Sequence, residues 1–255
     1  MDIQKSKLGD CNEVASTLCL IGSCLKRSGD YSDAESAYNE ALQMLESING
    51  DKHISLVDAL MGMAELKNCT EEYDEATEYH VECLEIQKSA FGKIHDSIAD
   101  TVYAMGLSKH NQGNYSRALV FFTKSIEIRT QLHGENHPSI GDAHNLMGFV
   151  EAKNGDLDAA LCRLEDALRV RKMLGNRLKE AETLLNIGHV HREKNQFELA
   201  LEHYDDCLSI RIAELGKGDV TVSDALMAIG NVKSDMAQHD GAVSSYKEGK
   251  TNLIC

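Results

Sequence analysis

The sequence predicts an all-α protein that is an array of six antiparallel helix pairs. Three observations support this prediction. An alanine recurs at a nearly fixed interval along the 255 residues, a small residue stands twelve positions before each of these alanines, and a large residue and then a second small one follow it. A fixed period of this length is typical of repeat proteins, in which each unit packs only against its neighbours.

The six alanines are 42, 42, 42, 40 and 42 residues apart. A small residue opposite a large one lets two antiparallel helices pack closely, because the large side chain fills the room that the small one leaves. We therefore assign helix packing to four sets of positions. They are the alanines Ala34, Ala76, Ala118, Ala160, Ala200 and Ala242; the small residues before them, Gly22, Ala64, Gly106, Gly148, Gly188 and Gly230; the large residues four positions after them, Tyr38, His80, Phe122, Leu164, Tyr204 and Tyr246; and the small residues seven positions after them, Ala41, Cys83, Ser125, Ala167, Cys207 and Gly249.

The first two repeats differ in their internal turns. In the first repeat, Gly29 and Asp30 mark the turn between the two helices. The second repeat has no glycine in its internal turn, and His80 occupies its large position. We expect this histidine to be a core residue with a hydrogen-bond partner. As a single array, the repeats are expected at approximately 11–52, 53–94, 95–136, 137–176, 177–218 and 219–255.

The third and fourth repeats are the most regular, with Gly113 and Gly155 at internal turns, where a helix ends in a conformation that glycine tolerates. The fifth is two residues shorter, and the loss falls in the turn before its first helix, so its helices keep their register. In the sixth, Gly241 and Gly249 lie within the second helix, where each costs about 1 kcal/mol relative to alanine. We expect this helix to fray. We also expect the end of the array, at Leu253–Cys255, to be covered by an oligomer contact or to belong to an incomplete chain.

This pattern resembles the tetratricopeptide repeat over nearly the whole chain, because the small residues of both helices and the large residue between them fall at the positions that mark this family. The long period and the segment Leu132–Pro138, LHGENHP, are more specifically similar to the kinesin light chain and nephrocystin type of repeat. The resemblance implies a right-handed superhelical solenoid whose first helices line a concave groove. It also implies a protein that binds other proteins.

Composition excludes several classes of function. The net charge of −15 argues against a nucleic-acid partner, because phosphate contacts need a basic surface, and favours a basic or mixed-charge protein or peptide. No apolar run approaches the roughly 20 residues of a membrane span, and residues 1–10 lack the apolar core of a secretory signal. We therefore expect no membrane insertion and a cytoplasmic protein. Eight cysteines without CxxC or zinc spacing indicate reduced, mostly buried thiols.

The sequence carries no sign of an enzyme or of a metal or cofactor site. The phosphate-loop, dinucleotide, zinc-protease and serine-hydrolase motifs do not occur. His189 and His191, two positions apart, point about 200° apart on a helix and cannot hold one ion. His53, His95 and His137 recur at one turn position, which favours a contact between neighbouring repeats over a ligand set. We expect no catalysis, no metal and no cofactor.

An acidic residue recurs near the start of five first helices, and two roles are open for it. It could form an acidic stripe on the concave face for a basic ligand. In four of these helices a serine or threonine stands three positions earlier, which is the arrangement of a capping box that satisfies free backbone N–H groups. The acidic residues are Asp58, Asp100, Asp142, Glu182 and Asp224, and the hydroxyl residues are Ser55, Ser97, Ser139 and Thr221.

The predicted function is a non-catalytic protein–protein interaction scaffold that binds a peptide segment of a partner in its concave groove. Amide side chains suit this role because each can donate to and accept from a peptide backbone, and aromatic side chains would act as anchors. The first-helix candidates are Tyr103, Asn111, Asn145, Phe149, Asn186, His189 and Asn231. In the kinesin-light-chain-like family asparagines recur on the first helix, and Asn145 and Asn186 resemble members of that set.

Three further roles are alternatives or additions to the peptide groove. The co-chaperone branch of the family binds a carboxylate tail with basic residues from consecutive repeats, and the candidates for such a clamp, Lys26, Arg27, Lys153 and Arg192, are too scattered to form it. The alternative function is a regulatory or targeting segment of a larger enzyme or motor complex. Self-association through the C-terminal repeat is also possible, because this repeat is the least regular.

Overall fold

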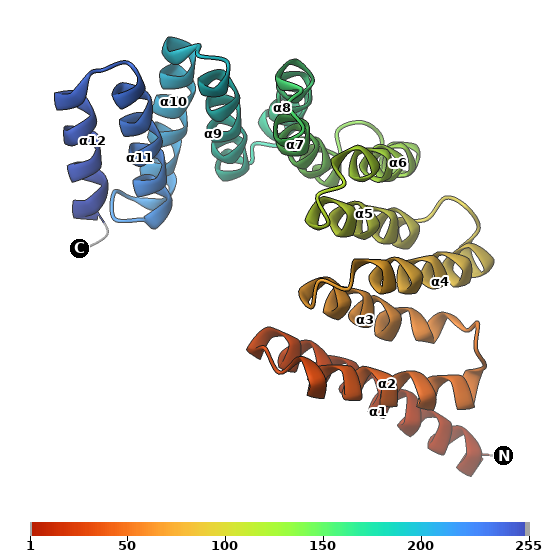
Figure 1. Ribbon diagram of the computed structural model, residues 1–255. Helices are drawn as coiled ribbons and strands as arrows, with labels where there is room; N and C mark the ends of the chain where they lie inside the picture. The colour runs from red at the N-terminus through yellow and green to blue at the C-terminus, as the bar shows by residue number, and fades with distance from the viewer. Residues whose placement is uncertain (1, 253–255) are drawn as a thin grey trace. The chain divides into compact units, whose positions relative to one another are not determined.

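The structure is a computed structural model that describes residues 2–252, with side chains described for residues 12–250. Within residues 2–252 all regular structure is helical, with no strand, which confirms the all-α prediction (Figure 1). The helices are α1 (Asp2–Ser28), α2 (Tyr31–Asn49), α3 (Val57–Cys69), α4 (Tyr73–Phe91), α5 (Asp96–Asn111), α6 (Tyr115–His133), α7 (Pro138–Lys153), α8 (Leu157–Met173), α9 (Arg177–Glu193), α10 (Phe197–Leu215), α11 (Val220–Asp235) and α12 (His239–Asn252), with a short 3-10 helix, η1 (Ile54–Leu56), before α3. The terminal residues Leu253–Cys255, where an oligomer contact was expected, lie outside the described range.

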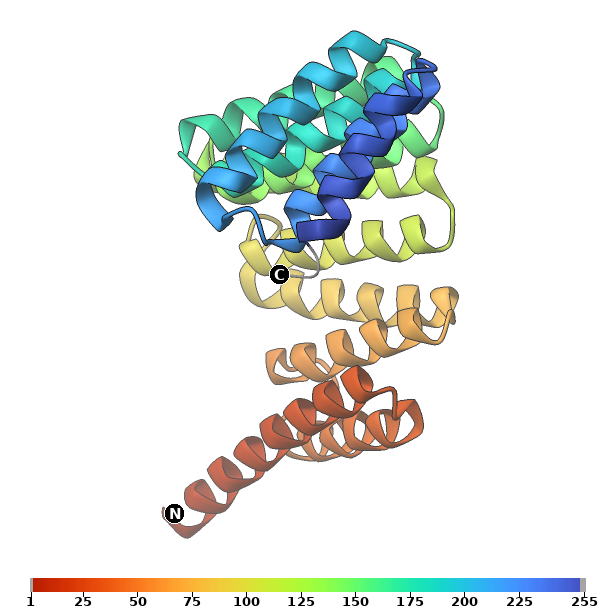
Figure 2. The same cartoon turned by 90° about the vertical axis from the view of Figure 1, so that its left-hand side faces the viewer.

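The chain divides into two compact units, residues 1–132 and 133–255. In the first unit α1 packs on α2, α3 on α4 and α5 on α6. In the second, α7 packs on α8, α9 on α10 and α11 on α12, and Figure 2 shows α11 beside α12. Within each unit, a second helix also packs on the first helix of the next pair. These are the six helix pairs that the sequence predicts.

The small and large positions interlock as expected. A Cβ atom at Gly188 would lie 2.4 Å from the ring of Tyr204, and one at Gly148 would lie 2.6 Å from Cγ of Leu164. Carbon atoms in contact normally lie about 3.5–4.0 Å apart, so only glycine fits at these positions. All six recurring alanines are at most 3% exposed. The period therefore marks the buried seam of each helix pair.

The second pair uses a different combination at this seam. Ala64 takes the place of the glycine and His80 takes the place of the large apolar residue, and both are fully buried. His80 Nε2 lies 3.3 Å from Ser108 Oγ, so the prediction of a core histidine with a hydrogen-bond partner is confirmed. Burial lowers the pKa of His80 to about 4, because a charged ring loses its hydration there.

The internal turns need one residue with positive φ. Glycine supplies it in three pairs, where Gly29, Gly113 and Gly155 have φ of 91°, 79° and 89°. The other three pairs use Glu71, Asn195 and Ala237, with φ of 65°, 58° and 59°. Such a conformation costs a residue with a Cβ about 1–2 kcal/mol. In the last pair, α12 continues through both of its glycines.

The first helices begin differently from the capping-box prediction, which is wrong. The N-cap residues of η1, α5 and α7 are His53, His95 and His137, and their Nδ1 atoms accept the backbone N–H groups two residues on, at 3.3, 3.2 and 3.4 Å. For α11 the cap is Asp219, which accepts from Thr221 N at 2.8 Å. The hydroxyl residues thus stand inside the helix, at the position that receives the cap. A side chain that accepts a free backbone N–H is what an N-cap requires, and an imidazole nitrogen supplies it here.

Two of these histidines, His95 and His137, also contact the helix that precedes them. The ring of His95 stacks on Phe91 with 4.1 Å between centroids, and the ring of His137 stacks on His133 at 4.4 Å. Phe91 ends α4 and His95 caps α5, so the predicted contact between neighbouring repeats is confirmed there. Capping explains why all three histidines recur, and stacking adds a second contact for His95 and His137.

Candidate functional site

Five of the seven predicted groove residues lie in the second unit, on three first helices that contact one another. Asn145 and Phe149 belong to α7, Asn186 and His189 to α9, and Asn231 to α11. The helix α9 contacts both α7 and α11. The small–large interlock with the second helices α8, α10 and α12 fixes the rotation of each first helix, so its remaining side chains project from the opposite side.

The two asparagines form a short hydrogen-bond chain. Asn186 Nδ2 donates to Asn145 Oδ1 at 3.2 Å, and Asn145 Nδ2 donates to Glu182 Oε1 at 3.3 Å. Asn145 is only 7% exposed, so its amide is committed to these two neighbours. Asn186 is half-buried and uses its amide N–H group in this chain. Asn145 therefore orients Asn186, whose amide oxygen is the acceptor that the pair offers to a ligand.

A hollow of about 290 Å³ lies between α7 and α9, beside these hydrogen-bonded asparagines. Phe149, Asn186 and His189 line it, as does Lys153, whose Nζ lies 5.4 Å from the centroid of the Phe149 ring. Arg192 lines the same hollow, together with Ala152, Leu164, Val190 and Glu193. Lys153 and Arg192, judged too scattered from the sequence, are thus brought to one place. Lys153 lies one turn after Phe149 on α7, and Arg192 lies one turn after His189 on α9. Residues one turn apart lie on the same face of a helix, so both cations lie on the faces that line the hollow.

His189 is held at the edge of this hollow by the buried Tyr204. The tyrosine hydroxyl and His189 Nδ1 are 2.7 Å apart, and the two rings pack edge to face at 5.3 Å. Desolvation of the covered side of the ring, together with the positive charges of Arg192 and Lys153, lowers the pKa of His189. The ring is therefore neutral near pH 7. In the tautomer whose Nδ1 accepts a hydrogen bond from the Tyr204 hydroxyl, Nε2 carries the proton and is a donor.

Arg192 is fixed by an acidic residue on the next first helix. Its Nε lies 2.6 Å from Asp235 Oδ2, and this hydrogen bond raises the pKa of Arg192. Asn231, also on α11, accepts a 2.8 Å hydrogen bond from the Tyr246 hydroxyl, and it does not line the hollow. The structure therefore brings together four of the predicted residues, Asn145, Phe149, Asn186 and His189, and leaves Asn231 apart.

The remaining two predicted residues, Tyr103 and Asn111, lie on α5 in the first unit. Tyr103 is half-buried, with its ring 5.2 Å from that of Phe122 and the Arg129 guanidinium 5.1 Å from its centroid. Asn111 is exposed, and its Oδ1 lies 3.2 Å from Nδ1 of His110. Tyr103 thus contributes to the packing of α5 on α6 as well as to the surface.

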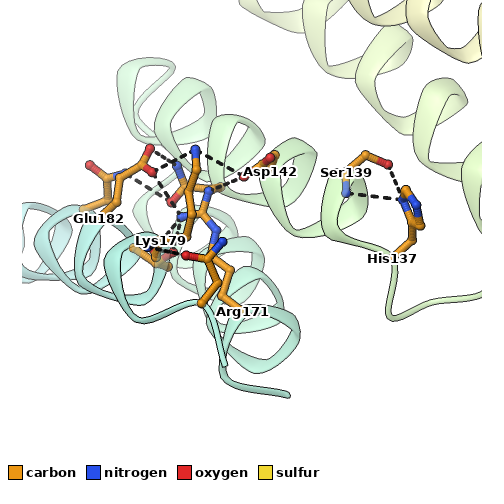
Figure 3. Close-up of polar contacts among 10 residues, drawn as sticks. His137, Ser139, Asp142, Arg171, Lys179 and Glu182 are labelled. Atoms are coloured by element: carbon orange, nitrogen blue, oxygen red, sulfur yellow. Dashed lines mark hydrogen bonds and ion pairs between the residues drawn. The ribbon is translucent and has the colours of Figure 1, made fainter. Parts of the chain in front are cut away.

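A column of buried arginines on the second helices escaped the sequence analysis. The residues are Arg129, Arg171 and Arg211, which are 8%, 3% and 8% exposed, and Gln87 occupies the equivalent position in α4. Arg171 donates to Asp142 Oδ1 at 2.7 Å and to the Lys179 carbonyl at 2.9 Å, so it joins its own pair to the next one (Figure 3). These positions are separated by the same intervals as the alanines, so the repeat period could have identified them as one set of equivalent residues.

This column gives the recurring acids a role that the sequence did not suggest. Asp100 and Asp142 each receive an arginine guanidinium at 2.7 Å from the second helix of their own pair. Glu182 lies 3.3 Å from Lys179, which also lies 3.6 Å from Asp142 (Figure 3). None of the four hydroxyl residues forms a capping box with these acids. Three of the five acids, Asp100, Asp142 and Glu182, instead form ion pairs with basic side chains of the protein itself.

In residues 12–250 no three histidine, cysteine or acidic side chains are grouped so that they could hold a metal ion. Across the described helices none has the length and apolar character needed to cross a membrane. Burial raises the pKa of the Cys83 and Cys207 thiols, to about 12 and about 11, so both stay protonated at neutral pH. Of the six cysteines whose side chains are described, only these two are buried, and Cys24, Cys69 and Cys162 are exposed, so the expectation of mostly buried thiols is wrong. The side chains of Cys11 and Cys255 lie outside the described residues.

Comparison with solved structures gives relatives in fold. BtubC (BKLC) from P. vanneervenii superposes with a TM-score of 0.74 at 16% identity, covering 87% of this chain and 89% of that one. A Podosopora anserina protein described as a kinesin light chain with nearly identical TPR-like repeats gives a TM-score of 0.67 at 14% identity, over 78% and 96% of the two chains. The Rap conjugation gene regulator of plasmid pLS20, in complex with the Phr* peptide, gives 0.61 at 15% identity, over 93% and 74%. No curated protein sequence matches.

The sequence pattern that defines the tetratricopeptide repeat matches residues 13–89, 97–173 and 179–251. These ranges include most of all six helix pairs, and their seams carry the interlocking glycine, alanine and large residues described above. Proteins of this family are generally non-catalytic scaffolds for protein interactions. The chain belongs to the tetratricopeptide repeat family.

Proposed function

We propose that this protein is a non-catalytic scaffold that binds a peptide segment of a partner across α7 and α9. The peptide lies over the hollow beside Phe149, its backbone bonds to the amide of Asn186, and an apolar or aromatic side chain enters the hollow. His189 supplies a further donor at the edge. Binding of this kind needs only a long surface with a few anchors, which an array of helix pairs provides.

One observation carries this proposal: a half-exposed aromatic ring, an oriented amide and a neutral histidine line one hollow. Phe149 is 39% exposed although it is a large apolar side chain. Asn186 is held in place by Asn145, so little side-chain freedom is lost when a peptide binds. The pLS20 regulator was solved with a peptide, and this likeness in fold supports a peptide as the ligand.

The test is site-specific photo-crosslinking in cells or lysate. A photoreactive phenylalanine analogue replaces Phe149 in one variant, and in a control variant it replaces Glu202, an exposed residue of α10. We expect a partner peptide to be captured from position 149 and not from position 202, and mass spectrometry of the cross-linked fragment gives its sequence. A synthetic copy of that peptide should then bind the wild type.

The variant Phe149→Ala/Asn186→Ala separates the surface from the fold. It should weaken binding of the synthetic peptide by about 100-fold, because an aromatic anchor and a hydrogen-bonded amide each contribute about 1–2 kcal/mol. Its circular dichroism spectrum should stay unchanged, since neither residue packs in a seam. Capture only from position 202, or equal affinity of this variant, would show that the partner binds elsewhere.

A further inference from the structure

The first unit contains one recurring acid that lacks its arginine. Asp100 is neutralised by Arg129, and in the second unit Asp142 is neutralised by Arg171, each at 2.7 Å. The equivalent acid in the second pair is Asp58, and the equivalent of the arginine is Gln87. Among the described side chains, none forms an ion pair with Asp58, which is exposed. The fixed period thus provides an internal comparison for this carboxylate.

Gln87 cannot neutralise Asp58 as an arginine would, because its amide carries no charge, and its oxygen is bonded to the next helix pair. It is 2% exposed, and its Oε1 accepts a 3.0 Å hydrogen bond from the Thr101 hydroxyl on α5. Arg171 makes the corresponding contact with Thr183, and its second guanidinium nitrogen also reaches the carboxylate of Asp142. Glutamine therefore keeps the hydrogen bond between neighbouring helix pairs, but it does not neutralise the carboxylate of Asp58.

Asp58 faces a hollow of about 400 Å³ between α1 and α3. The hollow has an apolar side, formed by Leu20 and Met61, and Leu20 is 68% exposed. Its polar side carries Asp58 and Glu65, and Glu65 is paired with Lys26. The remaining lining residues are Ser16, Cys19, Ser23, Tyr38, Leu45, Ser55 and Gly62. The hollow therefore combines an apolar wall with a carboxylate that forms no ion pair with any described side chain.

We propose that this hollow binds an arginine side chain of a partner protein. The aliphatic stem would lie on Leu20 and Met61, and the guanidinium would bind Asp58, as the chain's own arginines bind Asp100 and Asp142. An arginine fits better than a lysine because its planar fork can donate two hydrogen bonds to one carboxylate. The hollow lies in the first unit and shares no residue with the surface on α7 and α9, so this inference stands independently of the proposed function.

The test uses the full chain and a defined probe, the peptide acetyl-Ala-Leu-Arg-Leu-Ala-amide. Its counterpart with citrulline in place of arginine has the same shape without the charge. Both peptides are titrated to about 5 mM, which detects a Kd of about 1 mM, and the ¹³C-methyl NMR signal of Met61 reports binding in the hollow. We expect the arginine peptide to shift this signal and the citrulline peptide to bind at least about tenfold more weakly, a difference of about 1.4 kcal/mol.

Three variants connect the binding to Asp58. Asp58→Asn should lower the affinity for the arginine peptide about tenfold. Gln87→Arg should lower it by a similar factor, because the introduced arginine pairs with Asp58 and competes with the peptide. Asp100→Asn is the matched control and should bind as the wild type does. No shift of the Met61 signal at about 5 mM, equal affinity for citrulline, full affinity in Gln87→Arg, or an equal loss in Asp100→Asn would each overturn the proposal.

Discussion

Replacing Gly188 by alanine should destabilise the protein by about 2 kcal/mol. The new Cβ would lie 2.4 Å and 2.6 Å from two ring carbons of Tyr204, which is fully buried. Carbon atoms in contact lie about 3.5–4.0 Å apart, so the ring or the helix has to move by about 1 Å. Overpacking of this size costs about 1–3 kcal/mol, and the upper value applies because His189 holds the tyrosine hydroxyl. The better helix propensity of alanine offsets about 1 kcal/mol of this.

Gly249 provides the matched control, since it is also a buried helical glycine. A Cβ there would meet Leu226 Cβ and the Ser223 carbonyl at 3.5 Å, which is ordinary contact. Alanine occupies the equivalent position in α2 and α8, as Ala41 and Ala167. Gly249→Ala should therefore stabilise the protein by up to about 1 kcal/mol. The same substitution is expected to have opposite signs at the two glycines.

The assay is urea denaturation followed by far-UV circular dichroism, which gives the free energy of unfolding of each variant. A third measurement places Gly188→Ala in a Tyr204→Ala background. With the ring removed, the new methyl group has room. In this background Gly188→Ala should stabilise the protein by about 1 kcal/mol, the gain in helix propensity alone. If Gly188→Ala is neutral or stabilising while Tyr204 is present, the glycine is not required by the ring.

Three further substitutions test other parts of the fold by the same measurement. Ala237→Gly should stabilise by about 1 kcal/mol, because the φ of 59° strains a residue with a Cβ; a loss of stability would contradict this. Arg171→Met should destabilise by about 2–3 kcal/mol, since it leaves the Lys179 carbonyl and the Thr183 hydroxyl without their charged donor. The control Arg169→Met, at an arginine whose side chain is 50% exposed, should stay within about 0.5 kcal/mol of the wild type, and equal effects would argue against a buried clamp. The pKa of His80 is lowered to about 4 in the folded protein, while in the unfolded chain it is about 6.5, so protons bind the unfolded state more tightly. The free energy of unfolding should therefore fall as the pH decreases from about 6.5 to 4, by on the order of 3 kcal/mol. His80→Leu should remove this dependence, and an unchanged pH profile would assign it to other groups.

The sequence alone determined the helix pairs and their seams. Packing between two antiparallel helices repeats with the period of the unit, so Gly188 and Tyr204 could be paired from their spacing and the family could be recognised from the whole set. The period also explains why His80 could be placed in the core. Such positions are fixed by neighbours only a few turns away along the chain, and local sequence is enough to specify them.

The roles of the polar side chains were decided only by the tertiary structure. The pattern of Ser97 and Asp100 is the same whether the serine caps a helix or follows a cap, and the backbone geometry at His95 selects the second arrangement. The sequence around Asp100 likewise does not say which cation it pairs with. Its partner in the folded protein is Arg129, 29 residues further along the chain. Whether a carboxylate is paired, capped or open to a ligand depends on atoms brought close by folding, and Asp58 is left open because Gln87 stands where other pairs have arginine.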